Sequence, residues 1–389
     1  MMSYAKLTGA SPRMLVLESR YWLDTACIHA AQTMGWEVRR TPVHMQGKMP
    51  REKVEGLLRA LVEFRPDFIL TINLSGMDET GLFARLFADL GVPYVTWFAD
   101  DPRTILMGRT CYASDYAVAL TWERAYTEYL RDCGFAEVHT LPLAADLAVF
   151  NAEPADHWPG PPAFVGNSMV DFAEREWEWL RERPDLEAAV LDAFARGAVT
   201  RERFAKGVGA MLDPAVAGTL DAEASRHIEM VCFIEGTRRV RRAMAEAVTP
   251  EGAIMHGDPA WATLVSHHGP PIDYTEELPA FYRACPVNLN TTSIQMATTV
   301  NQRVFDCPAA GGFLLTDHQT ALEDLFDVEK EMATYHDHGE LVDLLRFYRD
   351  HPAERVAMTR RARTRILGEH TYTHRLKTIE AIIRARYGG

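Results

Sequence analysis

Short apolar segments alternate with amphipathic segments along the first 150 residues of the chain. The apolar segments occur at 13–18, 36–44, 67–73, 92–98, 115–121 and 136–143. Between them, residues 51–64 and 78–91 repeat apolar side chains at helical spacing. Short apolar strands that alternate with amphipathic helices predict a parallel sheet with helices on both faces. The pattern therefore predicts a Rossmann-like domain over residues 1–155.

A proline-rich segment, NAEPADHWPGPP at residues 151–162, interrupts this alternation and predicts a domain boundary. A strand and turn follow at 163–168, and a long helical section occupies about 172–248. Further strands are expected at 253–261, 286–290, 313–316 and 332–337, and helices at 352–369 and 373–387. These elements predict a second Rossmann-like domain over residues 156–370 with a helical insertion, and a C-terminal helix within 371–389 that packs back toward the first domain. Two such domains would enclose a central cleft, and open α/β sheets bind ligands at the carboxyl ends of their strands.

The composition narrows the class of protein. The chain has 389 residues, a net charge of −13 and 47% hydrophobic residues, which predict a folded, soluble protein with no general attraction to nucleic acid. Its six cysteines are scattered without a CxxC pair, which is typical of reduced thiols in a cytoplasmic protein. We expect no signal peptide and no integral membrane segment, since no run approaches the length of a membrane helix.

Several common catalytic motifs are missing or lack the required context. GVGAML at 207–212 does not follow a strand, and QGKM at 46–49 lacks the Ser or Thr of a P-loop. The sequence contains no GxSxG or HExxH. The histidine pairs at 267–268 and 336–338 have no second ligand pair at a suitable spacing, so no metal site is expected. NAD enzymes, P-loop NTPases, serine hydrolases and zinc proteases are therefore disfavoured.

Residues 301–317, NQRVFDCPAAGGFLLTD, combine ionisable groups with a Gly-Gly turn and an apolar strand. If residues 298–310 form a helix, its N-terminal amides and positive dipole end can bind an anion such as a diphosphate. Arg303 would supply a cation for phosphate oxygens, and Asp306 would accept hydrogen bonds from the adjacent hydroxyls of a ribose. Gly311 and Gly312 would end the helix. An Arg–Asp ion pair that caps a core helix explains the same residues equally well.

Residues 274–375 resemble the C-terminal half of GT-B glycosyltransferases. The likeness is closest to the CgeB-like group, which is named for a spore-maturation protein and is related to family-4 glycosyltransferases. It is carried by ELPAFYRACPVNLN, by the 301–317 segment, by the spaced segment 331–367 and by HTYTHR at 370–375. FVGNS at 164–168, TINLSGMDETG at 71–81 and VPYVTWFADDP at 92–102 extend the resemblance into the rest of the chain. The resemblance implies a GT-B fold with an N-terminal acceptor-side domain and a C-terminal donor domain.

The resemblance also implies a site for a nucleotide sugar. Asp306 occupies the position of the acidic residue that holds the donor ribose, which is usually glutamate in the family. The other implied donor-binding residues are Gly166, Asn167, Gly257, Asp258, Gln302, Gly311 and Gly312, with Arg303 as a catalytic cation. Asn288 and Asn290 are added because alternate residues of a strand share one face. One departure concerns the first of two glutamates found in family-4 enzymes, since Thr298 stands at that position.

The implied reaction is glycosyl transfer from a nucleotide-diphosphate sugar, as co-substrate, to a glycan or protein acceptor. No further cofactor and no metal are expected, because GT-B enzymes stabilise the leaving diphosphate with helix N-termini and cationic side chains. Kinship with family 4 implies a retaining reaction.

The segment WFADDP contains a candidate base in the first domain. Asp100 or Asp101 follows a strand and is a candidate to deprotonate an acceptor hydroxyl, whereas an Asp-Asp-Pro turn explains Asp101 somewhat better.

Two other functions fit the same fold. A sugar-nucleotide epimerase would need a pair of acid–base carboxylates and no acceptor. A non-catalytic scaffold would bind nucleotide without turnover and contact a partner through the 172–248 helices. The arginine runs at 237–242 and 360–365 are interpreted as solvated faces of an acidic protein.

Overall fold

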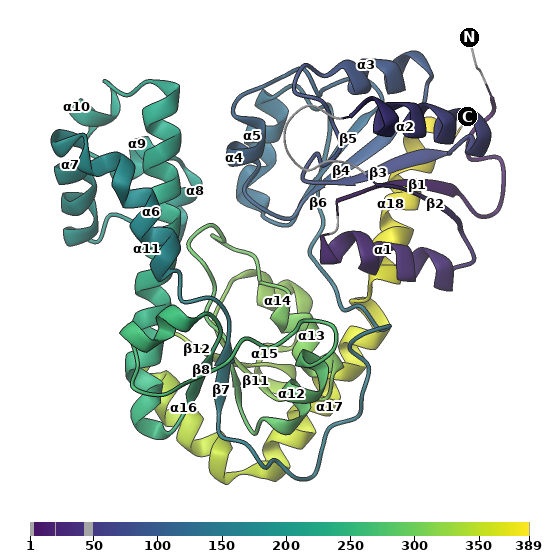
Figure 1. The fold of residues 1–389 in the computed structure, drawn as a ribbon. Helices are drawn as coiled ribbons and strands as arrows, with labels where there is room; N and C mark the ends of the chain where they lie inside the picture. Colours follow the sequence, from purple (N-terminus) through teal and green to yellow (C-terminus); the bar gives the residue numbers. More distant parts are fainter. Residues whose placement is uncertain (1–3, 20, 43–49, 389) are drawn as a thin grey trace. The chain divides into compact units, whose positions relative to one another are not determined.

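The computed structural model of the chain describes residues 4–19, 21–42 and 50–388. The chain divides into two compact units, each built around a six-stranded sheet (Figure 1). Unit 1 comprises Met1–Ala148 and His370–Gly389, and unit 2 comprises Val149–Glu369. The domain boundaries predicted from the sequence were residues 155 and 370.

The sheet of unit 1 is entirely parallel, with the order β2-β1-β3-β4-β5-β6. Its strands are β1 (Arg13–Glu18), β2 (Glu37–Pro42), β3 (Phe68–Ile72), β4 (Tyr94–Phe98), β5 (Ala117–Thr121) and β6 (Glu137–Thr140). The central strands β3, β4 and β5 are buried along their whole length, which explains why their sequences are continuously apolar. The last two residues of the predicted 36–44 strand lie outside the described residues.

The helices of unit 1 include one from the end of the chain. They are α1 (Trp22–Thr33), α2 (Arg51–Phe64), α3 (Leu82–Asp89), α4 (Pro102–Leu106), α5 (Thr127–Asp132) and α18 (Tyr372–Tyr387). The ring of Tyr372 at the start of α18 lies 6.4 Å from that of Trp22 and 6.1 Å from that of Trp97. These buried aromatic contacts fix α18 against α1 and the sheet, because each ring removes a large apolar surface from water.

Unit 2 also contains a parallel sheet, with the order β12-β11-β10-β7-β8-β9. Its strands are β7 (Ala163–Val165), β8 (Ile254–His256), β9 (His268–Gly269), β10 (Asn288–Leu289), β11 (Leu314–Asp317) and β12 (Ala333–Tyr335). The helices that follow β9 are α12 (Leu278–Ala284), α13 (Arg303–Ala309), α14 (Ala321–Leu325), α15 (Val328–Glu331), α16 (His338–Asp350) and α17 (Pro352–Glu369). The short strand β9 was not predicted.

The predicted helical insertion connects β7 to β8 and has a hydrophobic core of its own. Its helices are α6 (Val170–Arg181), α7 (Pro184–Ala195), α8 (Arg201–Ala205), α9 (Val208–Met211), α10 (Pro214–Ala217) and α11 (Ala222–Val248). The core of this helical segment includes Leu180, Val190, Phe204, Met211 and Ile228. The long helix α11 leaves it and packs Met244 and Val248 into the core of the sheet (Figure 1). Helix α11 therefore contributes to both cores.

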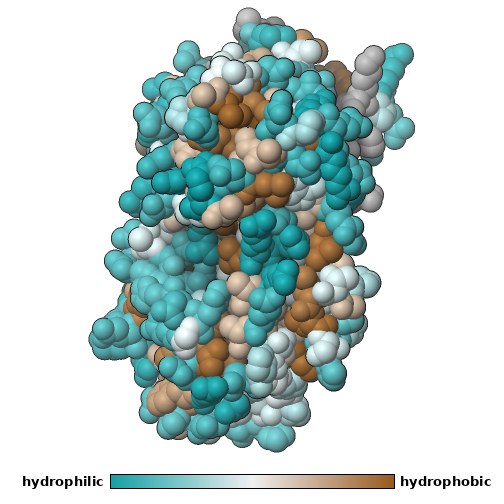
Figure 2. Space-filling model, turned by 90° about the vertical axis from the view of Figure 1, so that its left-hand side faces the viewer, coloured by the Kyte–Doolittle hydropathy of each residue, from teal (hydrophilic) through white to brown (hydrophobic). Residues whose placement is uncertain are grey.

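The face shown in Figure 2 is mostly hydrophilic, with hydrophobic side chains in patches. Among the described residues of unit 2, the exposed large hydrophobic side chains are Phe172, Leu191 and Phe347. No helix in the described part of the chain is long and apolar enough to cross a membrane.

The predicted helix over 298–310 is wrong in its first half. Helix α13 begins at Arg303, and residues 291–302 form an irregular loop. Thr298, Thr299 and Val300 are β-branched, which lowers their helix propensity. The loop is held instead by tertiary hydrogen bonds, including one from Ala321 N to the oxygen of Thr298.

Candidate active site at the carboxyl edge of the second sheet

Turns that follow β7, β8 and β10 bring several predicted residues together at the carboxyl edge of the unit 2 sheet. Gly166 and Asn167 follow β7, Gly257 and Asp258 follow β8, and Asn290 follows β10. Because β7 is a neighbour of both β8 and β10, all three turns meet at one edge. This is the point at which the connections of the sheet diverge, and open α/β sheets commonly bind ligands there.

Arg303, the first residue of α13, is anchored across two of these strands. Its guanidinium donates to Asn290 Oδ1 at 2.6 Å and to the backbone oxygen of Val165. The guanidinium carbon lies 4.7 Å from the centroid of the Phe164 ring. Asn290 is fully buried and donates its own amide to Thr316 Oγ1 at 2.9 Å. The arginine is therefore held in one orientation before any ligand binds.

Arg241, which projects from α11, approaches the same ring. Its guanidinium carbon lies 5.9 Å from the Phe164 centroid, and one of its nitrogens donates to the oxygen of Asn167 at 2.5 Å. Burial and, to a lesser extent, the positive charge of Arg303 lower the pKa of Arg241 to about 10, whereas Asp258 acts in the opposite direction. Two like charges are therefore held close enough to disfavour each other.

Neither arginine is neutralised by an ion pair. The contacts that Arg241 and Arg303 make in the described part of the chain are to carbonyl oxygens, an amide oxygen and an aromatic ring, and none is to a carboxylate. The Nε–H group of each arginine is buried and has no hydrogen-bond partner among these residues. The buried Nε–H groups without a partner, and two cations without an ion pair to a described carboxylate, both favour an anionic ligand at this position.

Two glycines allow the turns to pack closely. A Cβ atom at Gly257 would lie 2.2 Å from the backbone oxygen of Gly166, and one at Gly166 would lie 2.9 Å from the Phe164 ring. Asp258 accepts hydrogen bonds from the backbone and hydroxyl of Ser168 at 2.5 and 2.6 Å and caps the short helix Pro259–Thr263. Asp258 thus has a structural role in fixing the β7 turn, which the sequence did not predict.

Asp306 is buried on α13, with 1% of its surface exposed. Its carboxylate accepts hydrogen bonds from the Tyr274 hydroxyl at 2.6 Å and from Gln302 Nε2 at 2.7 Å. Arg303 and Asp306 therefore have different partners, since Arg303 contacts residues at the ends of β7 and β10. The contact from Tyr274 was not predicted, because nothing in the sequence links residues 32 positions apart.

The remaining donor-site predictions lie apart from the arginine pair. The amide of Asn288 is buried and donates to the backbone oxygens of Tyr282 and Phe313, which gives it a structural role. Gly311 and Gly312 end α13 and precede β11, at the opposite edge of the sheet. Gly311 has φ +79°, and a Cβ atom there would lie 2.5 Å from the backbone oxygen of Glu153. The two glycines therefore form the turn that ends α13. This is the role that chain geometry predicted for them, as distinct from the donor contact that the resemblance implied.

The two candidate aspartates of unit 1 differ in their surroundings. Asp101 is buried, accepts a hydrogen bond from Arg103 N as the N-cap of α4, and forms an ion pair with the Arg103 side chain at 2.6 Å. Asp101 therefore caps a helix, which is a structural role although not the predicted turn. Asp100 follows β4, is partly exposed and accepts a hydrogen bond from Asn73 Nδ2 at 2.8 Å.

Arg241 is the functional candidate that the sequence analysis missed. It belongs to the run TRRVRR, which was interpreted as a solvated face. That interpretation is wrong for Arg241, because α11 passes the β7 turn and partly buries this side chain, whereas Arg242 is exposed and pairs with Glu246. Arg238 and Arg239 both pair with the buried carboxylate of Glu235. Helical spacing alone does not show which of the four arginines faces the sheet.

No group of three or more metal-ligating side chains occurs among the residues that the structure describes.

The chain is similar in sequence to one known protein family. Residues 237–381, which include both arginines, match the family model described as glycosyl transferase-like. No curated protein matches the chain. The matched range includes strands β8 to β12 of unit 2, and nothing in these matches tests the narrower likeness to the CgeB-like group.

Solved structures show the fold. The chain is similar to sucrose-phosphate synthase from Thermosynechococcus elongatus, with 12% identity and a TM-score of 0.54 over 97% of this chain and 100% of that chain. A glycosyltransferase from Rickettsia africae gives 7% identity and a TM-score of 0.56 over 97% and 99% of the two chains. HepE from Anabaena, solved in complex with UDP-glucose, gives 10% identity and a TM-score of 0.53 over 96% and 98%. The two parallel sheets with their helices have the GT-B fold of these glycosyltransferases.

Proposed function

We propose that the protein is a glycosyltransferase that moves a sugar from a nucleotide-diphosphate donor to a glycan or protein acceptor, with the diphosphate bound by Arg241 and Arg303. The observation that carries the proposal is the pair of guanidinium groups around Phe164, which have no carboxylate partner in the described part of the chain. A diphosphate would supply the missing negative charge and accept from the two Nε–H groups.

The same arrangement suits the chemistry of glycosyl transfer. The bond between the anomeric carbon and the diphosphate oxygen breaks, and the negative charge that develops on the leaving group must be stabilised. Two arginines held in place by Asn290, Val165 and Asn167 require little reorganisation when this charge appears. We propose that they do this without a metal. A retaining outcome is proposed from the resemblance to family-4 enzymes alone.

The HepE complexes, which contain UDP or UDP-glucose, make a uridine nucleotide the first donor to test. We propose that Asp306 accepts hydrogen bonds from the ribose hydroxyls, which would replace those from Tyr274 and Gln302. Gly257 and the Asp258 turn are proposed to contact the base. In unit 1, Asp100 is proposed to receive the proton of the acceptor hydroxyl, because Asp101 is engaged by Arg103.

Thermal unfolding with UDP, GDP, dTDP, ADP and CMP tests the proposal. A nucleotide at about a hundred times its dissociation constant should stabilise the protein by roughly 2.7 kcal/mol. We expect one nucleotide to raise the melting temperature of the wild type and a smaller rise in Asp306→Ala. If the folded wild type responds to none of the five, the donor site is wrong.

Incubation of the responding nucleotide's sugar conjugates with the protein then separates the possible activities. A glycosyltransferase releases nucleoside diphosphate, faster with acceptor than with water. An epimerase would interconvert the sugar nucleotides without releasing the nucleotide, and a scaffold would leave them unchanged.

A further inference from the structure

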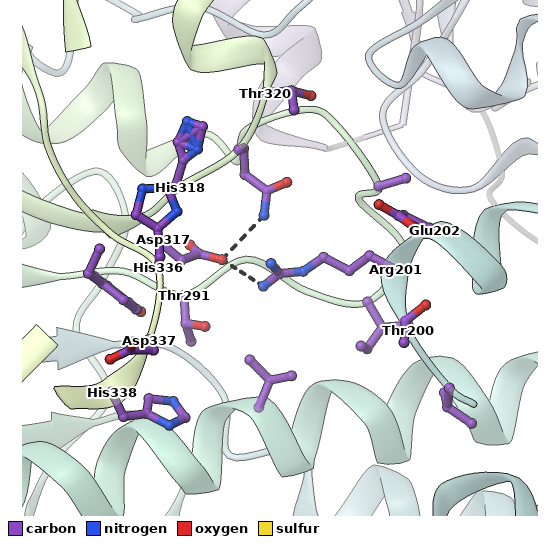
Figure 3. A pocket seen from close by; sticks show the side chains of 16 residues that line it. Thr200, Arg201, Glu202, Thr291, Asp317, His318, Thr320, His336, Asp337 and His338 are labelled. Carbon is purple, nitrogen blue, oxygen red and sulfur yellow. Dashed lines mark hydrogen bonds and ion pairs between the residues drawn. The ribbon is translucent and has the colours of Figure 1, made fainter. Parts of the chain in front are cut away.

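A pocket of about 630 Å³ lies within unit 2, where the helical segment meets the carboxyl ends of β11 and β12 (Figure 3). Its volume is in the range of small-molecule binding sites. Arg201 enters from the start of α8, and Asp317, His318 and His336 lie at or just beyond the ends of the two strands. None of the predicted donor-site residues lines this pocket.

The charges of the lining oppose an anionic ligand. Arg201 is the one arginine in the described lining, which also contains the carboxylates of Glu202, Asp317 and Asp337, and it pairs with Asp317. The remaining polar lining consists of groups that both donate and accept hydrogen bonds or that do so after a change of tautomer, namely Thr200, Thr291, Thr320, Gln319, His318, His336 and His338. A neutral ligand with many hydroxyl groups suits such a lining, because a hydroxyl both donates to carboxylates and accepts from N–H groups.

Apolar side chains complete the pocket. Val199, Val240 and Ile294 lie among the polar groups. A saccharide presents C–H surfaces between its hydroxyls, so a lining of this mixed kind matches it better than it matches a uniformly polar ion.

Arg201 is fixed in the pocket but has an unused donor. One of its terminal nitrogens donates to Asp317 Oδ2 and to the oxygen of Thr292, each at 2.6 Å. Its Nε–H group is buried and has no partner among the described residues. Asp317 is held in turn by the backbone and hydroxyl of Thr292, both at 2.9 Å to Oδ1. The helical segment thus supplies a positioned donor that a ligand oxygen would satisfy.

The pocket shares a wall with the arginine pair. Tyr335, which lines it, donates its hydroxyl to the backbone oxygen of Asn290 at 2.7 Å. The side chain of the same Asn290 accepts from Arg303 at 2.6 Å. On α11, Val240 lines the pocket and its neighbour Arg241 belongs to the pair. A ligand bound at the arginines would therefore adjoin this pocket.

We propose that the pocket binds a saccharide through its hydroxyl groups, and that Arg201 of the helical segment is its specificity-determining residue. The saccharide has two possible sources, the sugar of the donor or a unit of a separate glycan. The first source rests on the proposed function, whereas the second does not.

The test blocks the pocket without disturbing the arginine pair. Thr320 is exposed, lines the pocket and makes no side-chain capping bond, so Thr320→Trp fills the space on a folded background. Thr219→Trp is the matched control, because Thr219 is exposed on the helical segment and lies outside the pocket. Arg201→Lys keeps the positive charge and removes the Nε–H donor.

Calorimetric titration with UDP, UDP-glucose, ADP, ADP-glucose, GDP and GDP-mannose forms the first arm, and binding to a glycan microarray forms the second. If the pocket holds the donor sugar, Thr320→Trp and Arg201→Lys weaken binding of a nucleotide sugar at least tenfold and leave the parent nucleotide unchanged. If it holds a separate glycan, both variants lose array binding and retain both nucleotides. Thr219→Trp matches the wild type in each case.

Unchanged binding of every saccharide and nucleotide sugar in Thr320→Trp would overturn the proposal, as would a wild type that binds no saccharide in either arm. These results leave the proposed function standing if the nucleotides bind. Conversely, if no nucleotide binds, the proposed function fails while the array still decides whether the pocket binds a glycan.

Discussion

Arg241 and Arg303 both approach the ring of Phe164, with guanidinium carbons 5.9 and 4.7 Å from its centroid. They come from α11 and from the first residue of α13, which are separated by more than sixty residues of chain. Each is held by backbone or amide oxygens rather than by a carboxylate. Such a pair is unfavourable without an anion, and the predictions below follow from that property.

Replacing Arg241 with methionine should weaken nucleotide binding without lowering the stability of the fold. Folding with a charged Arg241 is disfavoured by burial and by Arg303, so the variant relieves repulsion while it loses one hydrogen bond to Asn167. We expect the free energy of unfolding in urea to remain within about 1 kcal/mol of the wild type or to rise. Nucleotide binding should fall in the same variant. A loss of several kcal/mol in stability would instead assign Arg241 a structural role.

Nucleotide affinity should decline at high pH. Burial and the charge of Arg303 lower the pKa of Arg241 to about 10, so the folded protein without ligand loses this proton near pH 10 while the unfolded chain retains it. The positive charge that binds phosphate is therefore present at neutral pH and is lost as the pH rises through 10. Titrations between pH 8 and 10.5 should show the decline in the wild type, and any decline that remains in Arg241→Met belongs to the nucleotide. If nucleotide affinity depends on pH in the same way in the wild type and in Arg241→Met, the charge of Arg241 does not bind the phosphate.

Gly311→Ala should destabilise the fold by roughly 1–3 kcal/mol, because it forces alanine into a left-handed conformation. Its Cβ would also lie 2.5 Å from the oxygen of Glu153. Gly368→Ala is the control, since this helical glycine has open space around it. Its replacement should raise the free energy of unfolding by about 0.5–1 kcal/mol. Urea unfolding measures both. Nucleotide affinity of the folded Gly311→Ala protein should match the wild type, and a selective loss of affinity would return Gly311 to the donor site.

Asp100 and Asp101 should respond differently to substitution. Asp101→Ala removes the α4 cap and the buried partner of Arg103, at a cost of roughly 2–4 kcal/mol in unfolding free energy. Asp100→Ala should cost about 1 kcal/mol or less, since it removes a hydrogen bond from Asn73. Nucleotide binding should be unchanged in Asp100→Ala, because its proposed partner is the acceptor. Weaker nucleotide binding in this variant would place Asp100 in the donor site instead.

Helices with strong local signals were predicted at the bounds that the structure has. Residues 51–64 form α2 and residues 352–369 form α17, because each has helical spacing and begins beside a proline. The loop at 291–302 was not predicted, since it is held by hydrogen bonds between residues well separated in the chain, from Asn301 to Asn290 and from Ala321 to Thr298.

The candidate site shows the same contrast between residues with a local signal in the sequence and residues whose place depends on tertiary packing. Asn290 was found because alternate residues at the end of a strand share one face, Gly166 through the resemblance to GT-B glycosyltransferases, and Arg303 through the ionisable pattern of the 301–317 segment. Arg241 was missed because its place depends on the angle at which α11 crosses the β7 turn. The buried contact from Tyr274 to Asp306 depends likewise on tertiary packing.

Titration of UDP, UMP and uridine into the wild type, Arg241→Met, Arg303→Met and Arg242→Met tests the central claim most directly. Arg242 is exposed, adjoins Arg241 in sequence and pairs with Glu246, so it controls for the loss of one positive charge. We expect UDP affinity to fall roughly 10- to 100-fold in Arg241→Met and Arg303→Met, in line with about 1.5–3 kcal/mol for a hydrogen bond to a charged group. Uridine should bind all four proteins alike, and Arg242→Met should bind UDP like the wild type. UDP affinity that is the same in all four proteins would show that the arginine pair does not bind the diphosphate.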